Sequence, residues 1–488
     1  MTLPHRSKLF FVGTGPGAIG LVTKRAFWAL KKADIVIYGR FINPNLLFYA
    51  SKKARYISAC NDEEAIFSEL SKLDGSRNTV WLTIGDPIFF SKHNRRMEKF
   101  AKLANLEIEI IPGVTSALAA STYSGILVSK PDCTDTVTIS VGKKVATGKT
   151  NCPKKSDSPT VIFFLALDCL RELTEELFKA GWHKSDACAI IENGTTQNRT
   201  VFGGLSEIAD MADSNGISEP ALFVCGQEAS SKNRFGWFEK KPLFSKKIVV
   251  TRPMPEGLDT VDKLEELGAD VLYLPVVNIV RLPCDIDSTD YDLVIFTSAK
   301  SVSCFFDNIK QSGIHAGRIG SIACVGKKTA AALSDYHLKA DIIPDDFSAK
   351  ALTDKLIIEE IEGKRILIPG SEMMNPAMSL RLREAGASVK LLYLYRPEKN
   401  PIQWSSLIEK KIENWGNIDY LMLTSGFIAK AAADFFENKR FLVEKSSKTV
   451  AISKNVGRIS KRLGFKNIIV SDEAAEESMI KKILDDIR

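Results

Sequence analysis

Short apolar runs rich in β-branched residues alternate with amphipathic stretches along the whole chain. In the first half these runs are residues 9–12, 35–38, 80–84, 108–111, 137–141 and 161–164. Runs of this length and composition predict strands, and the intervening stretches have the spacing of helices. Strands that alternate with helices from end to end predict an α/β fold.

Breaks in this pattern divide the chain. Residues 228–234 are polar, and a new strand-like run begins at residue 247, so we expect domains at 1–228 and 246–488 with a linker at 229–245. A second polar stretch, 142–158, interrupts the first half. We interpret it as a linker between two lobes of the first domain.

The second half contains an internal repeat. The segment 247–253 (KIVVTRP), a helix and 267–271 (LGADV) are echoed by 365–371 (RILIPGS), a helix and 385–389 (AGASV). In the same way, 291–298 (YDLVIFTS) matches 418–425 (IDYLMLTS). The repeat predicts two similar lobes with parallel sheets, lobe one at about 246–280 and 397–488 and lobe two at about 281–396.

Each Thr-Ser pair of the repeat ends a buried strand and begins a helix. Hydroxyls and free backbone N–H groups at such a position can hold a carboxylate, or the hydroxyl can simply cap the helix. The matched positions of the two pairs favour a shared ligand.

Composition narrows the class of protein. A chain of 488 residues is too long to fold around a single hydrophobic core, so we expect several domains. Its 45% hydrophobic and 26% charged residues are typical of a soluble protein. It has no apolar run long enough to span a membrane and no signal-like start, so we expect a cytoplasmic protein. The nine Cys residues show neither CxxC nor Cys/His ligand spacing, which argues against a metal site and a disulfide framework.

The net charge of +7 comes from Lys and Arg residues spread along the chain. Without an aromatic-interleaved basic patch, the charge does not indicate nucleic-acid binding. A small substrate with many carboxylates would fit it equally well, as would a solvated basic surface.

Four segments of the second half carry a family resemblance: 250–253 (VTRP), 296–299 (FTSA), 323–330 (ACVGKKTA) and 394–396 (LYR). In this order and spacing they resemble the uroporphyrinogen-III synthase family, from about residue 246 to the end. The resemblance implies two α/β lobes that hold the linear tetrapyrrole hydroxymethylbilane in the cleft between them. The family reaction expels the hydroxymethyl oxygen as water and closes the ring with inversion of the last pyrrole, ring D, without metal or organic cofactor.

The same resemblance implies site residues. Tyr395 matches the tyrosine proposed to assist hydroxyl loss, and the alternative is an aromatic packed beside Tyr393. Arg252 is either a charge partner of the substrate or a structural ion. One departure from the family occurs at 453–456 (SKNV), where a Gly-Pro-x-Thr-like turn is usual. The residues expected to bind carboxylates are Thr251, Thr297, Ser298, Ser371, Thr424 and Ser425.

The N-terminal half opens with a glycine-rich turn, 13–17 (GTGPG), between an apolar strand and a helix that begins near Leu21. With Ala18 it also satisfies GxGxxA, the pattern of a dinucleotide-binding unit. That alternative requires an acidic residue at the end of the second strand. Here the strand 35–38 ends in Gly39 and Arg40.

Four further segments decide between these readings: 83–87 (TIGDP), 111–117 (IPGVTSA), 123–126 (YSGI) and 191–196 (IENGTT). They resemble the tetrapyrrole methylases over about residues 9–228, and the last segment most resembles the uroporphyrinogen-III C-methyltransferase branch. The resemblance implies S-adenosylmethionine as cofactor. Its contacts fall on Pro16, Ile84, Gly85, Asp86, Phe89, Thr115, Ser116, Leu165 and Gly194.

The substrate side departs more from the branch than the cofactor side. Its acid/base positions carry Gly39-Arg40 and 58–61 (SACN), and Lys130 stands where an Arg that binds substrate is usual. The two resemblances together imply a bifunctional enzyme that makes uroporphyrinogen III and methylates it at C-2 and C-7 to precorrin-2, on the route to sirohaem or cobalamin. The alternative is a synthase whose N-terminal module is a cofactor-binding or dimerising scaffold, or a methylase for another precorrin. Methylases of this type are commonly dimers, so we expect a homodimer through the N-terminal domain.

Overall fold

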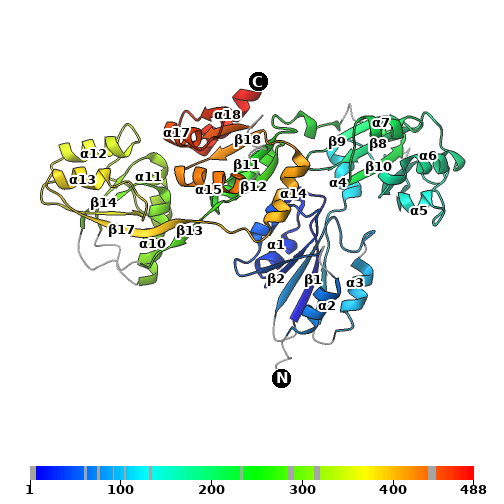
Figure 1. Cartoon of the computed structure of the whole chain (residues 1–488), viewed down its shortest axis with the longest axis horizontal. Helices are drawn as coiled ribbons and strands as arrows, with labels where there is room; N and C mark the ends of the chain where they lie inside the picture. The colour runs from blue at the N-terminus through cyan, green and yellow to red at the C-terminus, as the bar shows by residue number, and fades with distance from the viewer. Residues whose placement is uncertain are drawn as a thin grey trace. The chain divides into compact units, whose positions relative to one another are not determined.

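The structure is a computed structural model of the chain, and it describes residues 7–59, 63–73, 77–91, 93–103, 106–130, 135–230, 235–283, 291–312, 319–437 and 447–488. The described residues form four five-stranded sheets with helices between the strands, which confirms the predicted α/β class (Figure 1). The chain divides into two compact units, residues 1–274 with 402–488 and residues 275–401, and each is described by itself. None of the described helices has the length and apolar character needed to cross a membrane.

The first sheet is entirely parallel, with strand order β3-β2-β4-β1-β5. Its strands are β1 (Ser7–Gly13), β2 (Ile35–Tyr38), β3 (Arg55–Ser58), β4 (Asn78–Thr83) and β5 (Leu106–Ile111). Helices α2 (Glu63–Ser71) and α3 (His93–Phe100) cover one face through a core that includes Phe11 and Trp81. On the other face, Trp28 of α1 (Lys24–Lys31) packs edge-on against Phe10. Because β4 separates β1 from β2, the strand order differs from the 3-2-1-4-5-6 order of the dinucleotide-binding fold.

The second sheet has the order β6-β7-β10-β8-β9, with only the β6–β7 pair parallel. One face packs on α4 (Ser116–Tyr123) and the other on α5 to α7. The elements are β6 (Val137–Val141), α5 (Gly142–Ala146), β7 (Thr160–Phe164), α6 (Leu170–Lys179), β8 (Ala187–Glu192), β9 (Arg199–Gly204), α7 (Ile208–Ser214) and β10 (Ala221–Gly226).

The interpretation of residues 142–158 as a linker between lobes is wrong. They connect β6 and β7, which are neighbours in the second sheet, whereas the chain passes between the two sheets after β5, through α4. The stretch is polar because much of the segment after α5 lies at the surface.

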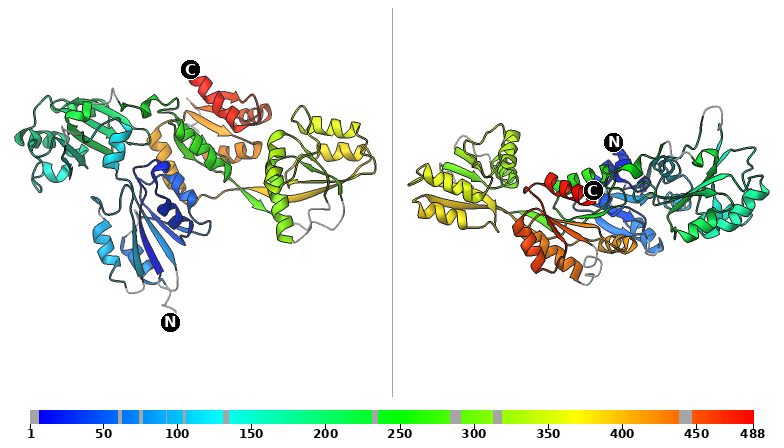
Figure 2. Two further views of the ribbon diagram at one scale, coloured as in Figure 1. Left: turned by 180° about the vertical axis from the view of Figure 1, so that it is seen from behind. Right: turned by 90° about the horizontal axis from the view of Figure 1, so that it is seen from above.

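The third sheet is parallel, with the order β12-β11-β18-β19-β20. The C-terminal helix of the chain, α18, is drawn in red in Figure 2 and packs against the strands β19 and β20 of this sheet. The elements are β11 (Lys247–Val250), α9 (Glu256–Glu266), β12 (Asp270–Tyr273), α14 (Ser405–Trp415), β18 (Tyr420–Leu423), α15 (Gly426–Phe436), β19 (Lys448–Ala451), α17 (Lys454–Arg462), β20 (Ile468–Val470) and α18 (Glu476–Ile487).

The fourth sheet lies in the unit 275–401, with the order β13-β17-β16-β14-β15, and only β13 runs antiparallel to its neighbour. Helices α10 and α11 pack on one face and α12 and α13 on the other (Figure 1). The elements are β13 (Val277–Arg281), β14 (Tyr291–Phe296), α10 (Ala299–Ser312), β15 (Ile319–Cys324), α11 (Lys327–Leu333), α12 (Ala349–Ile358), β16 (Arg365–Ser371), α13 (Ala377–Glu384) and β17 (Ser388–Lys399).

The strand orders confirm the internal repeat. The repeated segments are β11 and β16, and β18 and β14. The third sheet runs β12-β11-β18-β19 where the fourth runs β17-β16-β14-β15. Equivalent segments of sequence therefore occupy equivalent places in the four strands that the two sheets share.

Candidate functional sites

Three loops that follow parallel strands converge at the carboxyl edge of the first sheet. The backbone N–H of Gly85 donates to the carbonyl of Gly15 at 2.7 Å, which joins the loops after β4 and β1. A Cβ atom placed on Gly113 would lie 2.1 Å from the Gly85 carbonyl oxygen, and one on Gly13 would lie 2.5 Å from the Gly113 nitrogen. Glycine is therefore required for the loops to approach so closely, and they form a cradle of backbone groups.

Asp86 organises this cradle through both carboxylate oxygens. Oδ1 accepts from the backbone N–H groups of Ile88 at 2.9 Å and Phe89 at 3.1 Å, and Oδ2 accepts from the N–H of Gly113 at 3.1 Å. The carboxylate thus caps its own turn and ties the loop after β4 to the loop after β5.

An apolar rim lies beside the cradle. Ile88, Phe89 and Leu165 are 53%, 41% and 50% exposed, and Leu165 has a positive φ of 50° directly after β7. The ring of Phe90 lies 5.6 Å from that of Phe164, which connects the loop after β4 to the end of β7. A cavity of about 450 Å³ is lined by Asp86, Ile88, Phe89 and Phe90. Exposed apolar side chains around a cavity are typical of a binding site.

The other predicted cofactor residues surround the start of α4. Thr115 caps this helix by accepting from the N–H of Ala117, and Ser116 is its first residue. Gly194 lies against the same helix, because a Cβ there would be 2.4 Å from Ala120 Cβ. Ile84 is half-buried and Pro16 is buried in the loop after β1. The structure brings the predicted cofactor residues of the two sheets to one region.

The loop that contains Gly194 has an unusual backbone. Asn193, Thr195 and Asn198 have positive φ values of 47°, 89° and 48°. Non-glycine residues in this conformation cost free energy and persist only where surrounding contacts hold them. Thr195 is held by its buried Oγ1, which accepts from the N–H of Ala18 at 3.2 Å.

On the predicted substrate side, Lys130 lies 3.6 Å from Glu228 in an ion pair. Gly39 and Arg40 follow β2, and the Arg40 guanidinium lies 4.5 Å from the ring centre of Phe41. Ser58 ends β3, whereas Cys60 and Asn61 lie outside the described residues.

The Thr-Ser pairs of the repeat occupy the predicted turns. Thr297 and Ser298 lie between β14 and α10, and Thr424 and Ser425 lie between β18 and α15. Ser298 Oγ accepts from the N–H of Ser301, and Ser425 Oγ accepts from the N–H of Ile428, both at 3.1 Å. Each serine caps its helix in the same way, and the threonines are half-buried. Ser453 caps α17 by the same geometry at 3.4 Å, so the departure from the family pattern keeps a hydroxyl there.

Tyr395 lies on β17, and its hydroxyl is 3.4 Å from Ser298 Oγ. Its ring packs against the core between the fourth sheet and α10. Burial raises the pKa of the Tyr395 phenol above its usual value, and the hydrogen bond with Ser298 opposes this shift. The phenol is therefore protonated at neutral pH, with its hydroxyl next to a strand-end serine.

Other predicted carboxylate contacts have structural partners. Thr251 is fully buried, and its hydroxyl donates to the carbonyl of Met422 at 2.6 Å, which favours a role in joining β11 to β18. Arg252 forms an ion pair with buried Glu476 at 2.6 Å. Ser371 ends β16, and its Oγ accepts from the N–H of Met373 at 3.2 Å.

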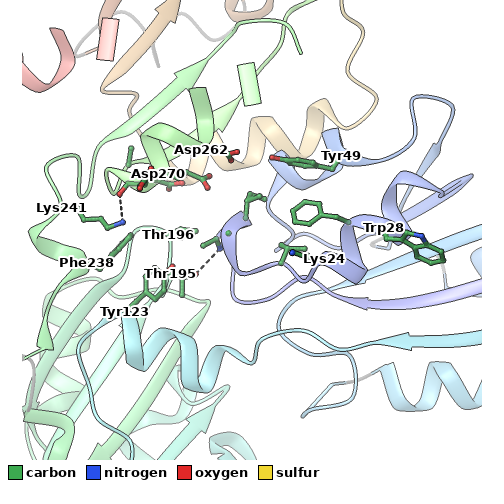
Figure 3. Close-up of a pocket in the computed structure, with 18 of the residues that line it drawn as sticks. Lys24, Trp28, Tyr49, Tyr123, Thr195, Thr196, Phe238, Lys241, Asp262 and Asp270 are labelled. Atoms are coloured by element: carbon green, nitrogen blue, oxygen red, sulfur yellow. Dashed lines mark hydrogen bonds between the residues drawn. The ribbon is translucent and has the colours of Figure 1, made fainter. Parts of the chain in front are cut away.

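One cavity was not predicted from the sequence (Figure 3). Its volume is about 790 Å³, and no residue that we assigned to a site from the sequence lines it. The residues that line it include aromatic side chains and acidic side chains of α9 and the start of β12: Phe27, Trp28, Tyr49, Tyr123, Phe238, Asp262, Glu265, Glu266 and Asp270. Burial raises the pKa of Glu265 to about 7. The residues that line the cavity are spread between positions 18 and 270, so no local motif of the sequence marks it.

Comparison with known proteins separates the two halves. The profile of the Tetrapyrrole (Corrin/Porphyrin) Methylases matches residues 8–209, and that of Uroporphyrinogen-III synthase HemD matches residues 259–481. The "Porphyrin biosynthesis protein HemD" of Ruminiclostridium josui is 28% identical over 97% of this chain and 97% of its own length.

Two further proteins resemble part of the chain. The "Uroporphyrinogen-III C-methyltransferase" of Bacillus subtilis (strain 168) is 28% identical over 61% of this chain and 65% of its own length. The solved uroporphyrin-III-C-methyltransferase of Thermus thermophilus covers 47% of this chain and 96% of its own, with 22% identity and a TM-score of 0.40.

Proposed function

We infer that this chain, which belongs to the tetrapyrrole methylase family over its first half and to the uroporphyrinogen-III synthase family over its second, is an enzyme of tetrapyrrole biosynthesis with two activities. The observation that carries this inference is the pair of family matches at 8–209 and 259–481, which together leave few residues for a third function. One relative aligns over 97% of this chain and 97% of its own length, so the similarity spans both halves.

For the second half we propose the conversion of hydroxymethylbilane to uroporphyrinogen III, with inversion of ring D. The reaction breaks the bond between carbon and the hydroxymethyl oxygen, and that oxygen leaves as water after it gains a proton. Tyr395 is our candidate donor, because its phenol is protonated at neutral pH and its hydroxyl lies 3.4 Å from Ser298 Oγ in the turn that follows β14. The residues of the site must also hold the substrate in a bent conformation, so that its two ends are positioned for closure of the ring.

The strand-end turns are our candidates for holding the substrate carboxylates. At Ser298 and Ser425 the hydroxyl satisfies one backbone N–H of the following helix, which leaves other first-turn N–H groups for an anion. Thr297, Thr424 and Ser371 stand beside such turns. Thr251 and Arg252 support the lobe through their buried partners, so we rank them below the serines.

For the first half we propose methyl transfer from S-adenosylmethionine, and the described residues fit this cofactor. The glycine cradle exposes backbone groups, Asp86 fixes the loops that form it, and Phe89 and Leu165 supply apolar surface. When bound, S-adenosylmethionine supplies an electrophilic methyl group. The chain's own task is to orient the pyrrole carbon and to exclude water.

The proposed substrate of this half is uroporphyrinogen III, methylated at C-2 and C-7 to precorrin-2. Lys130 and Arg40 are the candidate carboxylate partners, and Gly39 stands where the branch has an acidic residue. The missing acid makes a methylase for another precorrin, or a scaffold without turnover, the second candidate. We also propose that the methylase half forms homodimers.

One incubation tests both activities. The full chain is incubated with hydroxymethylbilane, with and without S-adenosylmethionine, and the products are analysed by mass and isomer. We expect the type-III isomer without cofactor and a product two methyl groups heavier with it. Only the spontaneous type-I isomer would refute the synthase, and an unmethylated type-III product in both incubations would refute the methylase.

A further inference from the structure

The strand β12 is the edge of the third sheet, and it is covered by side chains of the methylase half. Edge strands expose unpaired N–H and C=O groups that proteins normally cover. Asn45 is fully buried; its Nδ2 donates to the Val271 carbonyl at 2.9 Å, and its Oδ1 accepts from the Tyr273 N–H at 2.8 Å. One amide side chain thus bonds the strand as a neighbouring strand would. Phe48, three residues on, packs edge-on against Tyr273 at 4.7 Å.

The same segment also holds the loop after β1. Asn43 lies two residues before Asn45, and its Nδ2 donates to the Gly17 carbonyl at 2.9 Å. Its Oδ1 accepts from the N–H of Asn45 at 3.0 Å, which fixes the two side chains relative to one another. A continuous series of hydrogen bonds therefore runs from Gly17 to β12.

A second series runs from the same loop through the strained residues 193–198. Thr195 accepts from the N–H of Ala18, and two residues later Gln197 Nε2 donates to Asp270 Oδ2 at 3.0 Å. Asp270 is the first residue of β12 and is itself fixed by an ion pair with Lys411 at 2.9 Å. Figure 3 shows Thr195 with its hydrogen bond and Asp270 across the cavity.

Both series begin at one peptide group. The carbonyl of Gly17 and the N–H of Ala18 belong to the same planar unit, so Asn43 and Thr195 hold it from its two polar ends. Both series end on the strand β12, at Asp270 in one case and at residues 271–273 in the other. A planar unit fixed at both ends cannot rotate without breaking one of the two series.

We propose that β12 of the synthase half braces the cofactor loop of the methylase half through these two series, so that Asn45 and Gln197 are positioning residues for S-adenosylmethionine. The proposal rests on the proposed function in one respect, the identity of the ligand of this loop. Because coupling between sites is reciprocal, ligand bound at the loop must also stabilise the contacts of β12.

The test uses the full chain and three variants: Asn45→Ala, Gln197→Ala and, as a matched control, Asn215→Ala. Asn215 follows α7, and its amide donates to the Met211 carbonyl of that helix at 2.8 Å, away from the loop and from β12 in the sequence. Hydrogen exchange at Ala18 is measured without ligand, and the affinity for S-adenosylhomocysteine is measured by calorimetry. We expect faster exchange at Ala18 and roughly twofold to tenfold weaker binding in both test variants, the scale of one hydrogen bond, and no change in the control.

The wild-type chain gives the reciprocal measurement. S-adenosylhomocysteine should slow exchange of the Tyr273 N–H, although the predicted ligand contacts do not include this strand. If calorimetry shows that S-adenosylhomocysteine binds and the exchange of the Tyr273 N–H is still unchanged by it, the role of Asn45 is purely structural, and this result would overturn the proposal.

The remaining outcomes are distinguishable. Unchanged exchange at Ala18 in both test variants, or equal acceleration in the control, would overturn the brace, whatever the affinities. If the wild-type chain releases no heat with S-adenosylhomocysteine but exchange at Ala18 still accelerates in both test variants, the brace stands and the proposed cofactor is wrong.

Discussion

Replacing Tyr395 with Phe isolates the hydroxyl that we assign to proton donation. The Tyr395 hydroxyl lies 3.4 Å from Ser298 Oγ, longer than the 2.5–3.0 Å typical of a hydrogen bond between hydroxyls. Such a contact contributes at most the lower part of the roughly 0.5–1.5 kcal/mol of an ordinary hydrogen bond. The ring still packs on the core beside α10, so the free energy of unfolding should fall by less than about 1 kcal/mol.

Turnover should respond far more strongly. Loss of a general acid lowers kcat by about 10²-fold or more, which corresponds to about 2.7 kcal/mol of transition-state stabilisation. KM should change little because the ring remains in place. The assay follows hydroxymethylbilane consumption at saturating substrate and separates the type-III isomer from the spontaneous type-I isomer.

The pH profile and a neighbouring tyrosine complete this test. Burial raises the pKa of Tyr395, so the donor keeps its proton, and kcat should not lose the acid below pH 10. The raised pKa of Tyr395 also contributes to the free energy of unfolding. This contribution is fully present below pH 10, the pKa of an unfolded tyrosine, and is lost as the pH rises through the higher pKa of the folded chain. Tyr393→Phe on the same strand is the control, because its side chain is 42% exposed and should be silent. Near wild-type turnover in Tyr395→Phe would remove this residue as the acid.

Three further perturbations follow from the described contacts. Asp86→Ala removes an acceptor from three backbone N–H groups and should weaken S-adenosylhomocysteine binding at least tenfold by calorimetry, with cyclisation unchanged; unaltered affinity would reduce Asp86 to a turn residue. Glu265→Gln should raise the free energy of unfolding by about 1–3 kcal/mol at pH 8 and change it little at pH 4. The reason is that Glu265 has a pKa of about 7 in the folded chain and 4.5 in the unfolded chain, so the wild-type protein loses stability as the pH rises between these values. Equal effects in urea titrations at both pH values would contradict this. The fragment 246–488 should fold and yield the type-III isomer without cofactor, with lower stability than in the full chain; a well-folded fragment that yields only type I would show that the boundary or the assignment is wrong.

Local sequence pattern predicted the strands and the turns of the chain because both depend on neighbouring residues. The run 35–38 became β2 without change, since a short run of β-branched and aromatic residues that are all buried is typical of a core strand and too short for a helix. Ser298 and Ser425 became helix caps because a hydroxyl between a buried strand and a helix satisfies a free N–H. The repeat added topology, because equivalent sequences fold into equivalent sheets.

Burial and long-range contacts were not predictable in the same way. Thr251 was expected to contact a ligand because the family resemblance implied it, and in the structure its hydroxyl donates to the carbonyl of Met422, which is 171 positions away. The polarity of residues 142–158 was taken as a sign of a linker, although a loop within one sheet is polar for the same reason. Asn45 gave no sequence signal at all, since a buried asparagine is recognisable only from the backbone groups that it bonds.

The two sheets of the repeat cover the equivalent strands β12 and β17 by different means. In the fourth sheet, β17 takes the place of β12, and β13 pairs with it as an antiparallel strand through residues 395–399. In the third sheet no described strand covers β12, and Asn45 of the first half of the chain bonds its backbone instead. A synthase half separated from the methylase would therefore leave two backbone groups and the ring of Tyr273 without these partners, whereas the fourth sheet would lose nothing at its corresponding edge. The lower stability expected of the fragment should accordingly begin at β12, where amide exchange would accelerate first, and not at β17.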